Sequence, residues 1–443
     1  MKPALMILLG ASAWAQEELS LKQAVHLALE KNQSVAAARA SVDAAQSRIT
    51  EARSGRLPKV AYSESWARSD NPVFVFSSLL TQHQFGAENF QIGPLNRPDF
   101  LNNFQSLVTV DQTVFDAGQN RNATQRAEVA REIAAESQKL AEVDVIANVV
   151  RAYYGAILSV QQRDAAERAV RSAQADVERA QAIRSAGMST DADVLSIKVH
   201  LAAVQEQRIR READAEVARA ALNDAIGVPL DSSYTLSTSL VHANLASVAL
   251  ADYENTSVAE RGEAKQAKLA VSLAEKQSAE ARSALWPQVS VHGAFEADRQ
   301  NFYDKGGANW MISAGLRWNL FNGNSDRARI EETKSLVKQS QAEQERAGSA
   351  IRLQVRRAYA DLRAAEQRIE VAKASTEEAE ETLRILQNRY GAGMTNVTEF
   401  LRAETAALEA RLRFQAAIHD QRIAAVMLEM AAGRLNENSE VLN

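Results

Sequence analysis

The stretch that decides the fold is QNRYGAGMTNVTEFLRA, which runs from Gln387 to Ala403. A related stretch, QAIRSAGMSTDADVLSI, runs from Gln181 to Ile197, 206 positions earlier. In both copies a glycine next to a methionine can adopt the left-handed backbone that ends a helix. A Thr or Asn then precedes an acid by three residues, which is typical of the start of a new helix. Each copy therefore predicts the tip of a helical hairpin.

Very long helices fit on both sides of these tips. No proline lies between positions 98 and 229 or after 287, and proline disrupts helix interiors. The segments Gln119–Ser185 and Ser325–Tyr390 each contain one glycine, and at 1.5 Å per residue each would be about 100 Å long. We expect return helices at Asp191–Ile226 and Asn396–Ala432. Helices of this length are typical of coiled coils.

The second return helix has two apolar sides. Small and apolar residues from Phe400 to Ala431 recur at alternating steps of three and four, which is a heptad pattern rich in alanine. A second apolar row on another side comprises Leu401, Leu408, Leu412, Ile423 and Met427. A helix with two apolar sides packs against two neighbours, as in the wall of a helical barrel.

The two tips belong to a duplication of the whole chain. Glu51–Ser54 recurs as Glu280–Ser283, and Arg151–Tyr153 recurs as Arg357–Tyr359. The offset falls from 229 to 206 positions, so the first copy carries 23 additional residues (229 minus 206) after Pro58. The duplication predicts a first helix at 16–57 and 255–285, a β-hairpin at 58–115 and 286–321, a long helical hairpin at 116–227 and 322–433 with tips at 184–191 and 389–397, a linker at 228–254 and a tail at 434–443.

Between the helices the apolar period changes to two, which is the period of a β-strand. The clearest case is Trp310 to Leu320, although the first such segment carries Glu64 on its apolar side. Each segment has about the 9–11 residues of a membrane strand. Aromatic residues near strand ends are typical of membrane-interface girdles, and those expected to face lipid are Tyr62, Trp66, Phe295, Trp310 and Trp318. Two soluble hairpins over a core are the alternative, but rod-like helices could not bury these faces.

Four strands cannot close a barrel, and an open sheet edge in lipid leaves backbone groups unpaired. We therefore expect three copies to supply twelve strands, which is an even number of suitable size. The expected fold class is mainly α, with long antiparallel helical hairpins forming an α-barrel and four transmembrane strands per chain completing a 12-stranded trimeric barrel. The additional residues fall in Asn71–Phe100, which predicts a long external loop. Phe74 and Phe76 either plug or rim the outer mouth, or pack within that loop.

Composition excludes several other classes of function. Residues 1–15 have the layout of a signal peptide, with one lysine, an apolar run and Ala13-Trp14-Ala15. No later segment has the long charge-free apolar run of a membrane helix, so we expect any membrane crossing to use strands. Cysteine is absent, and the formal net charge of -5 gives no basic surface for nucleic acid. The six histidines lack ligand spacing and no nucleophile or phosphate-loop motif is present, so we expect no enzyme, cofactor or metal site.

The doubled plan, with NRYGAGMT and EFLRA at the second tip, resembles the outer-membrane efflux protein family, the TolC-like channels. The phrases ARASVDAA (38–45) and VFDAGQNR (114–121) are also similar to that family. The resemblance implies a homotrimer in outer-membrane lipid, with a periplasmic helical tunnel that docks on a periplasmic adaptor driven by an inner-membrane pump. Two departures are Asn32-Gln33, where many members have Asn-Pro, and the lack of a cysteine for lipid attachment.

The resemblance also implies a gate. Asp193 and Glu399 match family acids that narrow the periplasmic entrance, and three copies would form a carboxylate ring that selects cations. Their alternative and compatible role is as capping-box acids for Thr190 and Asn396. Arg402 stands where a further family acid would lie, and could pair across helices in the closed tips. The residues expected to contact the adaptor are Gly187, Met188, Ser189, Thr190, Gly393, Met394, Thr395 and Asn396.

These features predict a passive exit duct of a tripartite efflux or type I secretion system, gated at its periplasmic tips. The alternative is a periplasmic coiled-coil structural or adaptor protein without a pore. An adaptor would carry a Gly-rich lipoyl-like β-domain between its helices, and the sequence shows none. Drug, metal and protein export share one channel plan, so the sequence does not select the substrate.

Overall fold

The computed structural model describes residues 17–187, 189–242, 249–304 and 306–442. The expected signal peptide and the tip residue Met188 lie outside the described residues. The chain divides into two compact units, which are considered separately. Unit 1 comprises Met1–Ala40, Ala135–Gln266 and Glu345–Asn443, and unit 2 comprises Ser41–Ala134 and Ala267–Gln344.

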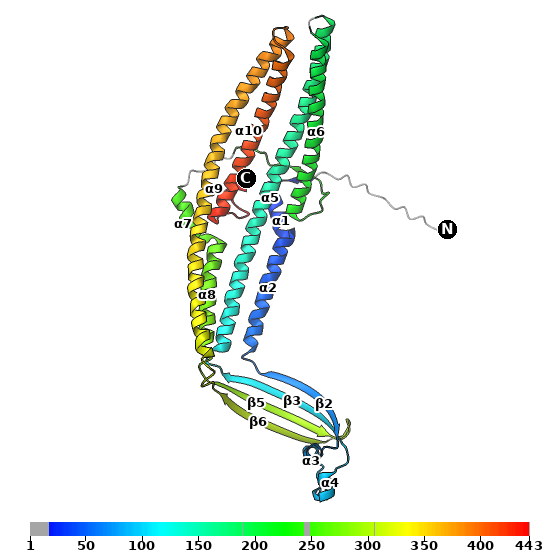
Figure 1. Cartoon of the computed structure of the whole chain (residues 1–443), viewed down its shortest axis with the longest axis vertical. Coiled ribbons are helices and arrows are strands. Elements are labelled where there is room, and N and C mark those ends of the chain that lie inside the picture. Colours follow the sequence, from blue (N-terminus) through cyan, green and yellow to red (C-terminus); the bar gives the residue numbers. More distant parts are fainter. Residues whose placement is uncertain (1–16, 188, 243–248, 305, 443) are drawn as a thin grey trace, which may run out of the picture. The chain divides into compact units, whose positions relative to one another are not determined.

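Unit 2 is built on one antiparallel sheet of four strands in the order β2-β3-β5-β6 (Figure 1). The strands are β2 (Lys59–Ser69), β3 (Leu101–Phe115), β5 (Gln288–Arg299) and β6 (Gly307–Arg317). The two sequence repeats therefore contribute one hairpin each, and the hairpins meet along β3 and β5. Within the described residues, β2 and β6 each pair along one edge only.

The register aligns an aromatic and apolar row across all four strands. Tyr62 lies opposite Val108, Val108 opposite Phe295, and Phe295 opposite Trp310. Trp66 lies on the same face, and the four of these aromatic residues that lie in strands, Tyr62, Trp66, Phe295 and Trp310, are exposed. The strand prediction for Trp310–Leu320 was too long, because β6 ends at Arg317 and the chain then turns through left-handed Gly323 and Asn324. Trp318 lies in this connection, where its indole donates a hydrogen bond to the Leu285 carbonyl at 3.1 Å.

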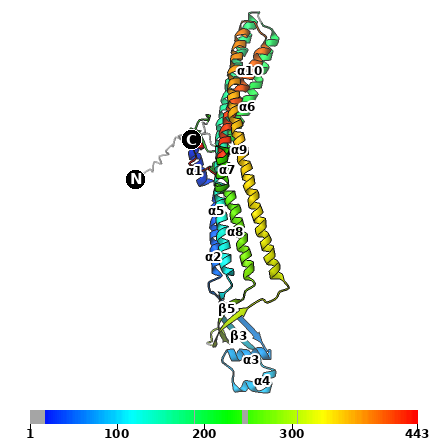
Figure 2. The ribbon, with the colours of Figure 1, turned by 90° about the vertical axis from the view of Figure 1, so that its left-hand side faces the viewer.

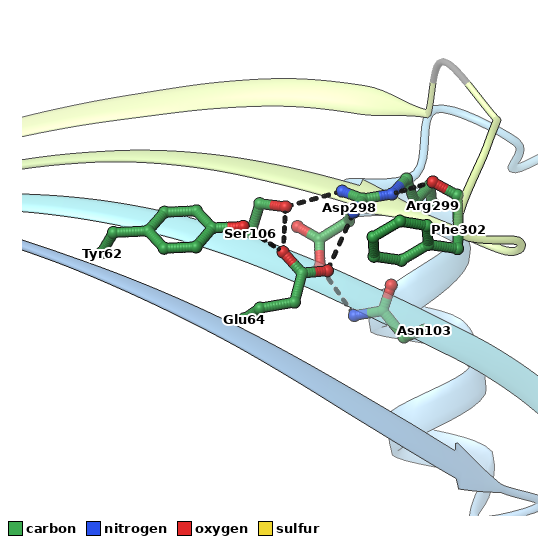
Figure 3. A network of polar contacts seen from close by, with 7 residues as sticks. All are labelled: Tyr62, Glu64, Asn103, Ser106, Asp298, Arg299 and Phe302. Atoms are coloured by element: carbon green, nitrogen blue, oxygen red, sulfur yellow. Dashed lines mark hydrogen bonds and ion pairs between the residues drawn. The ribbon is translucent and has the colours of Figure 1, made fainter. Parts of the chain in front are cut away.

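Glu64 can lie on the apolar face because its carboxylate accepts hydrogen bonds from side chains of β2, β3 and β5 (Figure 3). It accepts hydrogen bonds from Tyr62 at 2.7 Å, from Ser106, and from the Arg299 guanidinium at 2.8 Å. Arg299 also donates to Ser106 at 2.7 Å and to the Phe302 carbonyl at 2.9 Å. The network joins β2, β3, β5 and the turn after β5, and so opposes slippage of the strand register.

The segment between β2 and β3 is helical where the sequence predicted a loop. It contains α3 (Pro72–Thr81), the 3-10 turn η1 (Ala87–Phe90) and α4 (Ile92–Asn96). Asn71 caps α3 and Pro72 occupies its first turn, a common helix start. The ring centroids of Phe76 and Phe85 lie 4.7 Å apart, and those of Phe85 and Phe90 lie 5.0 Å apart. Phe76 therefore packs within the segment, which was the second of the two predicted alternatives.

The long helices end close to the positions that the sequence predicted. Helices α5 (Gln119–Ser185) and α6 (Asp191–Ile226) form the first hairpin, and α9 (Ser325–Gly391) and α10 (Val397–Ala432) form the second. Each return helix ends at a left-handed glycine, Gly227 or Gly433. These elements follow from local chemistry, namely missing prolines, capping side chains and terminal glycines.

The shorter segments are more divided than predicted. The first helix was predicted at 16–57, but the described residues of that range form β1 (Glu17–Leu19), α1 (Leu21–Lys31) and α2 (Gln33–Ser54) rather than one helix. The break lies at Asn32, whose side chain donates to the Ala225 carbonyl at 2.9 Å and accepts from the Ser34 amide. The second repeat divides likewise at Arg261, into α7 (Leu250–Glu260) and α8 (Gly262–Ser283). The expected linker and tail contain β4 (Tyr234–Leu236), which pairs in parallel with β1, and η2 (Glu440–Leu442).

The core of unit 1 surrounds the middle of α5. Tyr153 is fully buried, and its hydroxyl donates to the Leu19 carbonyl at 2.7 Å and accepts from the Thr238 amide at 3.1 Å. Contrary to the sequence expectation, α5 contains one 18-residue stretch apolar enough to cross a membrane, and half of that stretch is buried. The apolar residues from Val145 to Ala156 belong to this core, which accounts for their composition.

Candidate gate at the helical tips

Each tip closes by a glycine turn followed by a side-chain cap. Gly187 and Gly393 are left-handed, with φ of 79° and 70°. In the first tip, the Thr190 hydroxyl accepts from the Asp193 amide at 3.2 Å, and the Asp193 carboxylate accepts from the Thr190 amide at 3.0 Å. The first tip thus has the capping box that the sequence predicted as one role of Asp193.

The two candidate gate acids differ in their surroundings. Hydrogen bonds from the amide and hydroxyl of Thr190, with a further one from Ser189, hold the pKa of Asp193 below its usual range. Asn396 caps the second return helix by accepting from the Glu399 amide at 2.9 Å. The Glu399 carboxylate accepts from the Thr395 hydroxyl instead of completing a capping box. Glu399 is exposed, and its carboxylate is less enclosed than that of Asp193.

Arg402 forms no ion pair that joins the two tips among the described residues of one chain. Its side chain is exposed, and no ion pair within 4.0 Å joins it to another described residue. An ion pair does occur in the first tip, where Arg184 contacts Asp191, but both side chains are more than half exposed. Exposed pairs of this kind contribute about 0–1 kcal/mol. Apolar packing must therefore contribute most of the free energy that holds the tips together.

A small apolar cluster joins the two tips, which lie at the same end of unit 1 (Figure 2). This tip cluster draws on α5, α6, α9 and α10, and comprises Ala180, Val194, Ile197, Tyr390, Val397 and Phe400. The Phe400 side chain is 1% exposed and stacks on Tyr390, with ring centroids 5.2 Å apart and planes 4° apart. The sequence placed Phe400 on the heptad seam but did not identify Tyr390 as its partner.

Ionisable side chains form the next layer beyond the tip cluster. This charged layer comprises Asp176 and Arg179 of α5, His200 of α6 and Glu404 of α10. Arg179 contacts the Asp176 carboxylate at 3.1 Å, and His200 contacts Glu404 at 3.3 Å, so the second pair links the two hairpins. Burial, with a further contribution from Glu404, raises the pKa of Asp176 to about 6.

The charged layer and the tip cluster are neighbours. Burial raises the pKa of the Tyr390 hydroxyl, and the nearby carboxylates of Asp193 and Asp176 act in the same direction. The sequence analysis missed this layer because each of its members, taken alone, reads as a solvated helix residue. Across the described residues, no group of three or more His, Asp or Glu side chains is arranged to hold a metal ion.

Paired helical hairpins with glycine tips and a four-stranded sheet with one exposed aromatic face define a class of protein, the subunits of outer-membrane export channels. The sequence model described as "Outer membrane efflux protein" matches residues 24–228 and 256–434. The chain belongs to that family.

Two curated relatives and one solved structure illustrate the similarity. Protein CyaE of Bordetella pertussis is 29% identical over 349 residues, covering 77% of this chain and 73% of CyaE. The alkaline protease secretion protein AprF of Pseudomonas aeruginosa is 22% identical over 440 residues, covering 98% of this chain and 88% of AprF. The outer membrane channel CmeC of Campylobacter jejuni has the same fold, with a TM-score of 0.79, 16% identity, and coverage of 98% of this chain and 92% of CmeC.

Family membership confirms the expected class and location. The chain is an outer-membrane channel of the efflux and secretion type, with its helical tunnel in the periplasm. The alternative of a periplasmic rod without a pore is not favoured, because the family and the fold are those of channel proteins.

Proposed function

We propose that three copies of this chain form a closed, passive exit duct for a secreted polypeptide, working with a periplasmic adaptor and an inner-membrane pump. The observation that carries the trimer is the sheet of unit 2, in which the outer edges of β2 and β6 are unpaired within the described residues. In lipid each unpaired backbone group costs several kcal/mol. Pairing β6 of one copy with β2 of the next removes both edges at once.

The helices of unit 1 present matching surfaces for the same neighbour. On α6 the exposed apolar residues are Leu195, Val199, Ile209 and Val217, and on α9 they are Leu353, Val371 and Ile385. Their spacings place each set along one face of its helix. Apolar stripes on helices that are otherwise charged favour burial against another helix of the assembly.

Gating is assigned to the tips. The tip cluster holds the first hairpin against the second, so opening has to separate Ala180, Val194 and Ile197 from the Phe400 side. Asp193 and Glu399 would line the entrance in three copies, and ionised carboxylates favour cations there. The adaptor would meet the outermost turn residues, of which Met394 is 64% exposed, together with Gly187, Met188, Ser189, Thr190, Gly393, Thr395 and Asn396.

A polypeptide is the favoured cargo because of one relative. AprF, which this chain matches along nearly its whole length, is by its name a protein of alkaline protease secretion. A duct carries no energy source, so the pump supplies the driving force and most of the substrate choice. No enzymatic step belongs to this role.

The test is conductance combined with secretion. Purified protein in planar bilayers should form trimers that conduct ions, and loss of the gene should stop release of a polypeptide from the cell. A water-soluble monomer without conductance would contradict the duct. Intact polypeptide export in the deletion strain, together with lost resistance to small toxic compounds, would contradict the proposed cargo.

A further inference from the structure

The apolar face of the sheet extends to the end where the strands join the long helices (Figure 1). The last row on this face is Phe115 of β3, Val289 of β5 and Leu316 of β6, which lie opposite one another in the register. A β-bulge between Thr113 and Phe115 turns the Phe115 side chain onto this face. The bulge therefore extends the apolar surface to the junction with the helices.

Exposed apolar side chains continue past this row into the connections between strands and helices. Trp318 is held there by its hydrogen bond to the Leu285 carbonyl at 3.1 Å. A large exposed apolar surface is typical of a membrane contact, and tryptophan is enriched at membrane interfaces. Because the helical tunnel lies in the periplasm, this surface belongs at the periplasmic leaflet. We call it the collar; its members, all at least 44% exposed, are Leu57, Phe115, Leu285, Trp286, Leu316, Trp318, Leu320 and Phe321.

Four arginines lie on the helical side of the collar. Arg56 lies in the turn between α2 and β2, and Arg282 lies in the last turn of α8. Arg121 and Arg327, which are 206 positions apart in the repeat, lie in the first turns of α5 and α9. All four side chains are exposed, and no carboxylate of the described residues lies within 4.0 Å of their guanidinium groups. We call these four residues the basic band.

The surrounding chain leaves the charge of the basic band uncompensated. A helix N-terminus carries a partial positive charge, so the two first-turn arginines are unfavourably placed unless an anion lies nearby. In the first repeat, Arg53 contacts the Glu128 carboxylate at 2.9 Å. Its counterpart in the second repeat is Arg282, and Lys334 stands at the position that corresponds to Glu128. The second repeat has thus replaced the acid of this pair by a further cation.

We infer that the collar and the basic band form a binding surface for anionic phospholipids of the periplasmic leaflet. The inference rests on the proposed trimeric barrel, which puts the apolar face of the sheet against lipid. Acyl chains pack on the collar, and lipid phosphates accept hydrogen bonds from the guanidinium groups, whose forked donors suit phosphate. One arginine at an anionic lipid surface favours the charged lipid by about fivefold.

The test offers purified trimers equal amounts of two lipids with identical acyl chains, phosphatidylglycerol and phosphatidylethanolamine. Native mass spectrometry then counts each lipid that the trimers retain. We expect the original protein to retain at least about fivefold more phosphatidylglycerol, because only that lipid has a net negative charge. The combined variant Arg56→Gln, Arg282→Gln and Arg327→Gln should retain the two lipids about equally. Lysine at the same three positions should keep most of the preference, because it keeps the charge.

Two controls separate charge from apolar contact. The matched charge control combines Arg346→Gln, Arg352→Gln and Arg363→Gln, three exposed positions of α9. They lie at least 19 residues beyond Arg327, or about 28 Å along the helix, and should leave the lipid preference unchanged. Phe321→Gln changes a collar side chain that is 79% exposed, and should reduce the retention of both lipids by the same factor.

A phosphatidylglycerol preference that is missing from the original protein, or that survives in the arginine-to-glutamine variant, would overturn the lipid-binding surface. Displacement of phosphatidylglycerol by millimolar glycerol phosphate would overturn it as well, because the arginines would then bind a soluble anion without the collar. Conductance in planar bilayers is measured on the same preparations. Conducting trimers without lipid preference would leave the duct in place, whereas protein that neither forms trimers nor conducts would overturn the duct and the lipid-binding surface together.

Discussion

Replacing Phe400 by alanine should loosen the periplasmic tips without preventing assembly. Truncation of a buried Phe costs about 3–5 kcal/mol, and the Phe400 side chain is 1% exposed. Its stack on Tyr390 lies within the second hairpin and survives opening, so the contacts with the α5 and α6 members of the tip cluster distinguish closed from open tips. About half of the cost, roughly 2 kcal/mol, would then favour opening, which is roughly a 30-fold shift in the equilibrium.

The assay is single-channel conductance of purified trimers in planar bilayers, without adaptor or pump. Phe400→Ala should raise the fraction of time spent in the conducting state, and Phe400→Leu should lie between it and the original protein. Thr398→Ala, an exposed change on the same helix, is the control and should leave the conductance unchanged. Phe400→Ala trimers that insert normally and conduct like the original protein would refute the assignment of the closed state to the tip cluster.

Three further predictions concern the tips and the core. Because burial raises the pKa of Asp176 from 3.8 to about 6, its proton is held more tightly in the native state, so its stabilisation is present at low pH and lost as the pH rises through about 6. Hydrogen-exchange protection of the tip helices should thus fall between about pH 4 and pH 6.5, by at most about 3 kcal/mol, and stay level above that range, and Asp176→Asn should abolish this fall. Combined Asp193→Asn and Glu399→Gln should reduce cation selectivity, read as a reversal potential closer to zero in a salt gradient; unchanged selectivity would remove these acids from the entrance. Tyr153→Phe should destabilise unit 1 by about 1–3 kcal/mol in thermal unfolding, because it leaves the Thr238 amide without its partner, whereas the Leu19 carbonyl keeps a hydrogen bond from the Ser237 amide at 3.2 Å.

Features that depend on residues close together in the sequence could be predicted from it. The absence of proline allows the 67-residue helix α5, and the left-handed Gly187 and Gly393 end the long helices before Thr190 and Asn396 begin the next ones. Period-two alternation likewise indicates the four strands. Each of these signals acts within a few residues, so a single sequence is enough to detect it.

Features that depend on distant contacts could not be predicted. The division between α1 and α2 is stabilised by Asn32 bonding to Ala225, 193 positions away. The segment between β2 and β3 was expected to be a loop, because its helix α3 is short and is held by hydrogen bonds to β3 and β6. The charged layer was missed because its members come from three helices, and only their packing brings Asp176 and Glu404 together.

In the proposed duct, each chain contributes four strands to a single closed barrel. The most direct measurement uses Ser63→Cys on β2 and Ser313→Cys on β6, two positions on the sheet face opposite Tyr62 and Trp310 in a chain without other cysteines. Treatment of membranes with a short bifunctional maleimide should give covalent trimers as the largest product, because β6 of each copy meets β2 of the next. Monomers linked only within themselves, or products that extend beyond three chains, would contradict it.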